Sequence, residues 1–407
     1  QVAEDLTNKG VLLILGDEYL EHLSGDYIFR SPGIRPDLPQ IQKAVEGGSV
    51  LTSEMELFFD LCPARTIGVT GSDGKTTTTT IVAGLLDAAG IKTFVGGNIG
   101  RALLPYVHDM KPEDAAVVEL SSFQLTQMKQ SPHVAIVTNV APNHLDWHTD
   151  MQEYIDAKKN LVAYQCADDR TVLNLDNAIT ASYAADCVAP VTYFSRKKKV
   201  DNGCWLNESG YIVFSENGVD TTVMHADDIR IPGVHNVENY MAAIAAVWGH
   251  LAPDDIRTFA RAFGGVAHRC ELVRERKGVR WYNDSIGSSP SRTIAGLKAF
   301  SQKVILIAGG YDKHIPYDPL GPVAADTVKA AILMGATASA IETAISAHSD
   351  LPIYRVANME EAVATANHIA RDGDIVFMSP ASASFDMYKN FEVRGNHFKD
   401  LVLALPE

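Results

Sequence analysis

The feature that most constrains this chain is a glycine-rich loop between an apolar run and a helical run. Residues 70–77 read TGSDGKTT; they follow the strand-like run Thr66–Val69 and lead into the helical run Thr77–Ala89. Glycines in this context let backbone N–H groups turn toward phosphate oxygens, and the helix N-terminus adds positive potential. The usual spacing places a glycine five residues before Gly74, but Val69 stands there. The pattern therefore predicts a variant phosphate loop; the alternative is a glycine-rich turn with an accidental lysine.

Two side chains of this loop have a direct chemical use. Lys75 can reach the terminal phosphates of a nucleotide, and the Thr76 hydroxyl can coordinate Mg²⁺. ATP and Mg²⁺ are therefore the expected ligands, although a P-loop kinase or a nucleotide-switch protein would carry a similar loop. The residues expected to bind ATP here are Gly71, Ser72, Asp73, Gly74, Lys75, Thr76 and Thr77.

The whole chain alternates apolar strand-like runs with helical runs. This alternation predicts an α/β fold with parallel sheets covered on both faces, and ligands beyond the carboxyl ends of the strands. The expected strands are Val11–Leu15, Tyr27–Phe29, Thr66–Val69, Ala115–Leu120, Val134–Val140, Thr171–Leu175, Val304–Ala308, Ala330–Met334 and Ile375–Met378. The clearest expected helices are Leu38–Glu46, Thr77–Ala89 and Met151–Gln165. A small antiparallel excursion is expected from Cys204–Leu206, Tyr211–Phe214 and Val223–His225.

Polar side chains follow the expected strands nearest the loop. Glu119 ends one buried run, and His144 follows the next within TNVAPNHLD. Because the carboxyl ends of parallel strands meet at one edge of a sheet, both residues suit a magnesium site. The alternatives are a helix-capping acid at Glu119 and a loop histidine without a ligand at His144.

Lys158 interrupts an apolar helix stripe. Thr149 and Gln152 fit a capping box at the start of that helix, and Tyr154, Lys158 and Leu161 then share one face. Burial lowers the pKa of an amine, and a neutral amine can react with carbon dioxide to form a carbamate, an anionic ligand for Mg²⁺. The alternative is a lysine that extends from the edge of the stripe to solvent.

Several weaker signals lie further along the chain. Asn236 and Asn239 lie three apart at the start of an alanine-rich helix, where paired amides can contact a purine edge or simply cap the helix. Arg269 suits a phosphate, and Asp284 suits a ribose or a metal-bound water. Carboxylate binding by Lys313 and Ser384 is also plausible, because both follow expected strands; each signal alone is weak.

Charge and composition limit the partners. The formal net charge is −15, which argues against nucleic acid or an anionic membrane as the main partner. No apolar run approaches the roughly 18 residues of a membrane span. The opening residues QVAEDLTNKG do not resemble a signal peptide, and we expect an upstream segment. A reducing, cytoplasmic location is expected because the cysteines are scattered without a metal or disulfide spacing: Cys62, Cys166, Cys187, Cys204 and Cys270.

Taken together, the motifs resemble one known family. Nine segments occur in one order: TGSDGKTT, ELSSFQL, TNVAPNHLDW, YIDAK, GVHNVEN, HRCE, NDS, GGYDK and SPASASFDMYKNFEVRGNHF. This set resembles the Mur ligases of peptidoglycan synthesis over nearly the whole chain. The resemblance implies three domains: an N-terminal Rossmann-like remnant for the UDP substrate (1–63), a central P-loop parallel-sheet ATPase domain (64–264) and a C-terminal Rossmann-like domain for the amino acid (265–407). The remnant is expected to lack its first strand and glycine-rich loop and to keep only Ser31-Pro32-Gly33.

The resemblance also implies an activity. The segments ELSSFQL and NFEVRG look most like the family member that adds D-glutamate to UDP-N-acetylmuramoyl-L-alanine through an acyl phosphate. The alternatives within the class are another amino-acid-adding Mur ligase or a folylpolyglutamate synthase-like ligase. The diaminopimelate-adding member carries a D-N-P-R segment that is absent here. A monomer is expected.

Roles for single residues follow from the same resemblance. The catalytic residues would be Lys75, Glu119, His144 and Lys158. Two magnesium ions would be held by Thr76, Glu119, His144 and carbamylated Lys158. The muramoyl-alanine end would contact Asn98, Ser121 and Gln124. The nucleotide would also be held by Asn236, Asn239, Arg269 and Asp284. D-glutamate would be bound by Lys313, Ser384 and Phe391.

Two positions depart from the pattern of many relatives. Ile286 stands where many carry a lysine after the NDS motif, which places more demand on Lys313 as the cation for the amino acid. Asp73 stands where many carry asparagine, and its carboxylate would lower phosphate affinity or add a contact to a metal-bound water.

Overall fold

The computed structural model of the chain describes residues 2–145 and 147–406. Its contacts divide the chain into two compact units, each built around its own sheets. The first unit comprises Gln1–Val223 and Glu238–Ile256, and the second comprises Met224–Val237 and Arg257–Glu407. The division into domains at residues 63 and 264 stays a prediction.

The helices and strands of the first part of the chain are α1 (Val2–Asn8), η1 (Asp17–His22), β1 (Tyr27–Phe29), α2 (Pro39–Glu46), β2 (Val50–Thr52), α3 (Glu54–Leu61), β3 (Arg65–Thr70), α4 (Lys75–Ala88), β4 (Thr93–Gly97), η2 (Leu104–Asp109), β5 (Ala115–Glu119), α5 (Ser122–Leu125), β6 (Val134–Val137), α6 (Met151–Ala163), β7 (Arg170–Asn174), α7 (Ala178–Ser182) and η3 (Tyr183–Asp186). They continue with β8 (Val191–Ser195), β9 (Gly203–Leu206), β10 (Tyr211–Glu216), β11 (Val219–His225), η4 (Ala226–Asp228), α8 (His235–Val247) and α9 (Pro253–Ala262). The last part contains β12 (Glu271–Arg276), β13 (Val279–Asn283), α10 (Pro290–Leu297), β14 (Val304–Ala308), α11 (Leu320–Thr327), β15 (Val328–Leu333), α12 (Ala338–Ser346), β16 (Ile353–Arg355), α13 (Met359–Ile369), β17 (Ile375–Met378) and α14 (Phe391–Leu403).

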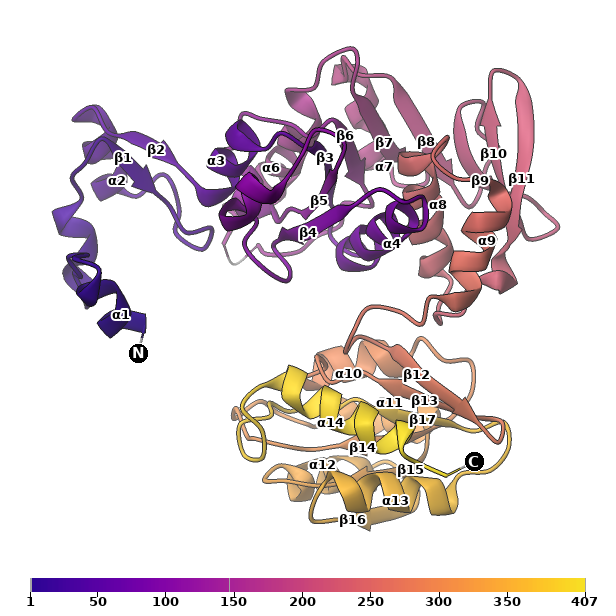
Figure 1. The fold of residues 1–407 in the computed structure, drawn as a ribbon. Coiled ribbons are helices and arrows are strands. Elements are labelled where there is room, and N and C mark those ends of the chain that lie inside the picture. Colours follow the sequence, from indigo (N-terminus) through magenta and orange to yellow (C-terminus); the bar gives the residue numbers. More distant parts are fainter. Residues whose placement is uncertain (1, 146, 407) are drawn as a thin grey trace. The chain divides into compact units, whose positions relative to one another are not determined.

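The main sheet of the first unit confirms the expected α/β class. Its nine strands run in the order β11-β10-β9-β8-β7-β6-β3-β5-β4, and the pairs from β4 to β9 are parallel. α4 packs on β3, β4 and β5, while α3 and α6 bury apolar side chains with the sheet in a separate core (Figure 1). The connection after β3 leads to β4 on one side of β3, whereas the connection after β5 leads to β6 on the other side. The carboxyl ends of β3 and β5 therefore flank a topological switch point, which is where open α/β sheets bind ligands.

The expected antiparallel excursion is part of this sheet. β9 pairs with β8 in parallel, and only then does β10 pair with β9 in the antiparallel sense. The excursion is therefore an extension of the parallel sheet along one edge.

The N-terminal region holds a separate two-stranded parallel sheet of β1 and β2. The expected strand Val11–Leu15 is wrong, because the structure has irregular backbone there. Leu12 and Leu15 are 85% and 78% exposed. An isolated apolar run has no partner for its backbone N–H and C=O groups, so its β propensity alone does not produce a strand.

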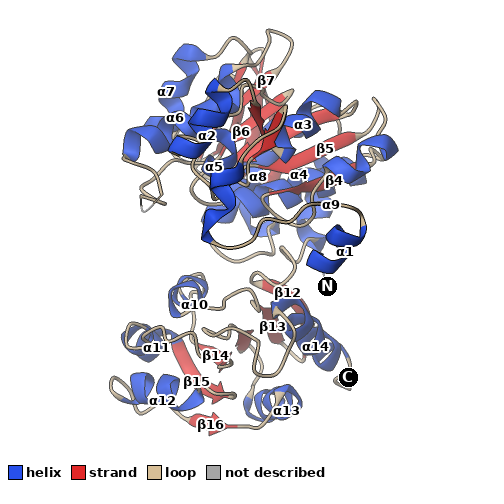
Figure 2. Cartoon of the chain, turned by 90° about the vertical axis from the view of Figure 1, so that its left-hand side faces the viewer, coloured by secondary structure: helices blue, strands red, loops and turns tan. Residues whose placement is uncertain are grey.

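The second unit is built on a six-stranded sheet in the order β12-β13-β17-β14-β15-β16. All neighbouring pairs are parallel except β12 with β13. Alternate residues of β14 face different cores: Leu306 packs with α10, α11 and α12, and Ile305 packs with α13 and α14. Helices therefore cover both faces of this sheet, as Figure 2 shows.

Among the described residues, no helix combines the length and the apolar character that crossing a bilayer requires.

Candidate functional site

The phosphate loop lies between the end of β3 and the start of α4, as predicted. Lys75 Nζ donates hydrogen bonds to the carbonyl oxygens of Gly71 and Ser72, each at 3.0 Å. The segment that follows β6 holds the loop backbone, because Thr138 Oγ1 donates to Asp73 O at 2.6 Å and Asn139 Oδ1 accepts from Asp73 N at 3.0 Å. The Asp73 side chain is exposed, so its carboxylate lies at the open side of the loop.

Gly74 has a backbone conformation that only glycine adopts easily. Its φ is 79°, and a Cβ added there would lie 2.3 Å from Asn239 Oδ1. The same amide oxygen accepts a hydrogen bond from Thr78 Oγ1 at 3.3 Å. Asn239, which was expected on the adenine side, therefore lies against the loop and the first turn of α4. Thr76 is buried and Thr77 half-buried in that turn.

Glu119 lies at the carboxyl end of β5, beside β3. It is 1% exposed, and its Oε1 accepts a hydrogen bond from Asn98 Nδ2 at 2.8 Å. Its Oε2 is buried, and none of the described residues forms a hydrogen bond with it. A buried carboxylate oxygen without a donor is costly unless a cation or water meets it, so this atom fits a magnesium ligand.

The predicted burial of Lys158 in an apolar helix stripe is confirmed, since the residue is only 1% exposed. Its Nζ donates to Gly71 O at 2.8 Å and to Thr70 Oγ1 at 3.4 Å, and it lies 4.7 Å from the ring centroid of Tyr154. Burial, reinforced by the charge of Lys75, lowers the pKa of Lys158 well below its usual value. The amine therefore lies under the phosphate loop, and its environment favours the neutral form.

His144 occupies the loop after β6 in a left-handed backbone conformation, with φ of 55°. Its ring is exposed and lies edge-on to Phe123 at 5.0 Å between centroids. Asp146, in the same motif, lies outside the described residues. Across residues 2–145 and 147–406, no three His, Cys, Asp or Glu side chains gather in a way that alone would hold a metal ion. The expected set of Thr76, Glu119, His144 and Lys158 contains only two such residue types.

The side chains of Ser121 and Gln124 each accept a hydrogen bond from the backbone N–H of the other residue. Ser121 Oγ accepts from Gln124 N at 3.3 Å, and Gln124 Oε1 accepts from Ser121 N at 2.9 Å. This capping box begins α5 directly after the strand that carries Glu119. Their expected contact with substrate stays a prediction.

The start of α6 differs from the prediction. The N-cap is Asp150, whose side chain accepts from Glu153 N at 2.8 Å, so the expected box of Thr149 and Gln152 is wrong. Asp150 has the extended backbone that an N-cap needs, and its carboxylate is a strong acceptor. Gln152 instead pairs with Asp156 on the helix surface.

Asp284 is the central charged group of the second unit. It is 4% exposed, and its carboxylate accepts from Ser379 Oγ at 2.6 Å and from Cys270 N at 3.2 Å. Burial raises its pKa to about 6, against the opposing effect of the charge of Arg269. Asn236, in the first turn of α8, donates from its side-chain amide to Pro232 O at 2.6 Å.

The loops carrying the expected acceptor residues pair with each other. Tyr311 N donates to Ala383 O at 2.9 Å, which joins the loop after β14 to the loop after β17. Lys313 on the first loop is exposed, whereas Ser384 on the second is buried. Phe391 begins α14, and its carbonyl oxygen accepts from Ser285 Oγ at 2.7 Å.

Arg394 hydrogen-bonds two loops of this region, and the sequence motifs predicted no role for it. It is fully buried, and its guanidinium donates to the backbone oxygens of Ser285, Ser382 and Ala383 at 2.9–3.1 Å. It also donates to Ser285 Oγ at 3.0 Å. The only sequence signal is an arginine inside an otherwise buried helix face of the NFEVRG segment. Arg394 therefore connects the loop after β13 with the loop after β17.

Two family models match most of the chain. The Mur ligase middle domain matches residues 69–247, and the glutamate ligase domain of the Mur ligases matches residues 268–382. The chain is 54% identical over 410 residues to a UDP-N-acetylmuramoylalanine–D-glutamate ligase of Acetivibrio thermocellus, covering 99% of this chain and 88% of that protein. It is 51% identical over 406 residues to the protein of the same name from Ruminiclostridium cellulolyticum, covering 98% and 87%.

Solved structures share the fold at low sequence identity. A UDP-N-acetylmuramoyl-L-alanyl-D-glutamate–2,6-diaminopimelate ligase aligns with a TM-score of 0.62 at 17% identity, over 90% of this chain and 91% of that one. A UDP-N-acetylmuramate–alanine ligase from Thermotoga maritima aligns with a TM-score of 0.59 at 17% identity, over 98% and 90%.

Proposed function

This chain belongs to the Mur ligase family, and from that premise we propose that it joins D-glutamate to UDP-N-acetylmuramoyl-L-alanine at the expense of ATP. The observation that carries the ATP-dependent chemistry is the convergence of Lys75 and Lys158 on one glycine-rich loop at the switch point of the sheet. The substrates come from the names of relatives that match nearly the full chain at about half identity.

The first step is phosphoryl transfer. The terminal carboxylate of the L-alanyl substrate attacks the γ-phosphorus of ATP, the bond to the bridging oxygen breaks, and an acyl phosphate and ADP result. Lys75 leaves the carbonyl oxygens of Gly71 and Ser72 and neutralises charge on the transferring group, while loop N–H groups orient the phosphates.

The second step forms the amide. The amine of D-glutamate attacks the acyl carbon, inorganic phosphate leaves, and the nitrogen loses a proton. Lys313, Ser384 and Phe391 are proposed to hold the amino acid in the second unit. Arg269 and Asp284 are proposed for the nucleotide, with Asn236 and Asn239 on the adenine side.

Mg²⁺ fits the residues around the loop. Glu119 Oε2 offers a buried oxygen that forms no hydrogen bond with any residue the structure describes, and Thr76 offers a hydroxyl at the start of α4. His144 is proposed as a further ligand. When bound, Mg²⁺ neutralises phosphate charge and orients the phosphate oxygens.

Lys158 is proposed to carry a carbamate that serves a second metal ion. The proposal is supported by its burial under the loop and by the short distance to Gly71 O. Nuclear magnetic resonance after ¹³C-bicarbonate labelling should show a carbamate carbon in the wild-type chain and none in Lys158→Ala. An unmodified Lys158 in an active enzyme would contradict this part of the proposal.

The proposal includes a monomer in the cytoplasm, consistent with the free thiols of the described cysteines. Sedimentation velocity of the purified chain measures the oligomeric state directly.

The decisive experiment measures phosphate release with UDP-N-acetylmuramoyl-L-alanine, MgATP and a panel of amines. D-glutamate should be used about 10³ times better than D-alanine or D-glutamine, because a neutral side chain would leave the hydrogen-bond donors of a site built for a carboxylate unpaired.

Lys75→Ala should lower the rate of phosphate release by roughly 10²–10⁴ while the fold is kept. Ile286→Lys should lower the KM for D-glutamate. Faster addition of L-lysine or diaminopimelate would contradict the assigned acceptor, and near-normal turnover by Lys75→Ala would contradict the phosphate loop.

A further inference from the structure

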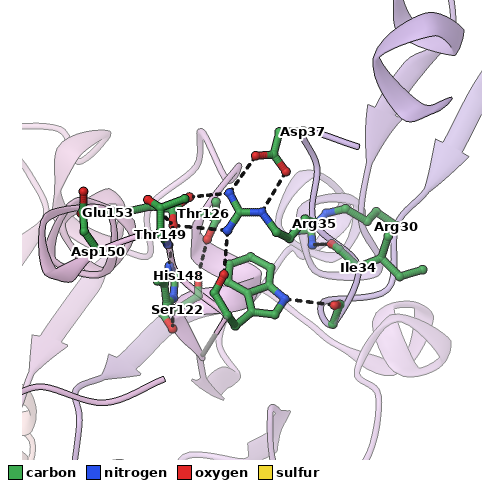
Figure 3. Close-up of polar contacts among 12 residues, drawn as sticks. Arg30, Ile34, Arg35, Asp37, Ser122, Thr126, His148, Thr149, Asp150 and Glu153 are labelled. Atoms are coloured by element: carbon green, nitrogen blue, oxygen red, sulfur yellow. Dashed lines mark hydrogen bonds and ion pairs between the residues drawn. The ribbon is translucent and has the colours of Figure 1, made fainter. Parts of the chain in front are cut away.

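The guanidinium of Arg35 has an acceptor for each of its N–H groups (Figure 3). Two donate to Asp37, at 2.9 and 2.7 Å, and two donate to Glu153, at 3.3 and 3.0 Å. The fifth contact is with the carbonyl oxygen of Trp147 at 2.7 Å. Asp37 lies on the same segment as Arg35, whereas Glu153 and Trp147 lie more than a hundred residues later. Arg35 therefore joins the N-terminal region to the loop between β6 and α6.

Trp147 also donates a hydrogen bond back to the segment that carries Arg35. Trp147 Nε1 donates to Gly33 O at 3.0 Å, and the guanidinium of Arg35 lies 5.0 Å from the indole centroid. The turn that contains Gly33 is itself wrapped around the buried Arg30, which donates to Pro32 O at 3.1 Å and to Phe123 O at 2.9 Å. A turn fixed on both sides in this way is a rigid support for Trp147.

The same loop carries His144. Trp147 N and His148 N both donate to the carbonyl oxygen of His144, at 3.1 and 3.0 Å. His144 has a positive φ, which a non-glycine residue keeps only when its surroundings hold it there. Two hydrogen bonds therefore connect Arg35 to the backbone of His144: one from Arg35 to Trp147 O, and one from Trp147 N to His144 O.

Glu153 holds the other end of this loop. Its carboxylate accepts from Thr149 N at 2.6 Å and faces His148 Nδ1 at 3.4 Å. His148 is buried, and its Nε2 lies 2.9 Å from Ser122 Oγ in α5 (Figure 3). Arg35 is therefore linked to the residues on both sides of His148. It donates directly to Trp147 O, and it is linked to Thr149 through the carboxylate of Glu153.

We propose that Arg35 is a positioning residue that, through Trp147 and Glu153, holds the backbone of His144 in the orientation needed to bind the metal–nucleotide complex. This inference rests on the proposed role of His144 as a metal ligand. Removing a residue that orients a metal ligand typically costs 10–100-fold in metal affinity or activity, although the residue never touches the ion.

The test compares the full-length wild type with Arg35→Gln. Mn²⁺ binding in the presence of a non-hydrolysable ATP analogue, followed by electron paramagnetic resonance, should weaken about tenfold in the variant. The Mg²⁺ concentration for half-maximal phosphate release should rise in parallel, while the KM for D-glutamate stays within about twofold. A residue with only a structural role would lower the melting temperature and the active fraction but leave both metal dependences unchanged.

Trp147→Phe provides a second variant if Arg35→Gln does not fold. It removes the hydrogen bond to Gly33 O and keeps an aromatic ring, so Mn²⁺ binding should weaken in the same direction by a smaller factor. Arg355→Gln is the matched control, because Arg355 donates to the carboxylate of Glu342 at 2.7 Å and to Ser339 Oγ at 2.9 Å, and neither residue has a proposed role. Its Mn²⁺ affinity should equal that of the wild type.

Wild-type Mn²⁺ affinity in the folded Arg35→Gln and Trp147→Phe variants would overturn the positioning role. So would the absence of nucleotide-dependent Mn²⁺ binding in the wild type. A change of acceptor in the amine panel, with the Mn²⁺ effect intact, would overturn the proposed substrate and leave the role of Arg35 standing.

Discussion

At the scale of single residues, two buried groups of opposite charge, Lys158 and Asp284, have pKa values that are shifted for the same reason. Burial lowers the pKa of the Lys158 amine and raises the pKa of the Asp284 carboxyl to about 6. In each case the charged form loses solvation by water, and the neutral form is favoured. Lys158 is thereby suited to react with carbon dioxide, and Asp284 to exchange a proton near neutral pH.

The Asp284 shift predicts a pH-dependent stability. Its folded pKa of about 6 lies above the ordinary value of 3.8, so the folded state binds the proton more tightly. The resulting stabilisation is complete below about pH 4 and is lost as the pH rises through 6. The free energy of unfolding of Asp284→Asn should therefore gain about 2 kcal/mol relative to the wild type between pH 4 and pH 7. Urea unfolding at a series of pH values measures this difference.

Ser379→Ala provides the control for that experiment. Ser379 Oγ donates to Asp284 and stabilises the charged carboxylate, so its loss should move the transition to higher pH. A difference between Asp284→Asn and the wild type that does not vary with pH would contradict the shifted pKa.

At the scale of elements, the buried side chain of Arg394 joins α14 to the loops after β13 and β17. Arg394→Met should lower the free energy of unfolding by about 3 kcal/mol or more, because the buried oxygens of Ser285, Ser382 and Ala383 lose their donor. Chemical denaturation of the full chain measures the change. Arg371→Met is the matched control, since Arg371 also donates to two backbone oxygens but is exposed, and its effect should stay within about 0.5 kcal/mol.

Local sequence patterns predicted most strands of the nine-stranded sheet and half of those in the six-stranded sheet, because apolar runs bounded by turns are typical of buried parallel strands. They also predicted the burial of Lys158, since the 3/4 spacing of a helix places it beside Tyr154 and Leu161. The same patterns were wrong at Val11–Leu15, where no strand is available for pairing. At α6 they were wrong by one residue, because Asp150 is the stronger cap.

Contacts between distant segments were beyond prediction from local patterns. Arg394 and Ser285 lie 109 residues apart, and Arg35 and Glu153 lie 118 residues apart. Neither pair has a periodicity or spacing that signals it, because the fold as a whole brings the partners together. The chemical groups of the candidate site were therefore predictable, whereas the residues that hold them in place were not.

At the scale of the whole molecule, the second unit has its own sheet and a core on each face of it. We therefore expect a fragment of residues 265–407 to fold alone and to unfold cooperatively, as circular dichroism during heating would record. A fragment of residues 303–407 is the matched control. It lacks β12, β13 and α10, so β17 keeps β14 on one side but is unpaired on the other, and the transition of the fragment should be broad or absent. A broad transition for 265–407 as well would contradict an autonomous unit.

The contact of Asn239 with Gly74 and Thr78 has a consequence for how the protein is made. A ribosome adds about 5–20 residues per second, so the chain grows for roughly 10–30 s between the synthesis of Gly74 and that of Asn239. During this interval the nascent polypeptide has its phosphate loop but not the asparagine that packs on it. A growing chain therefore cannot complete the packing of this loop until α8 has left the ribosome, and translation itself delays the moment at which the loop reaches its final form.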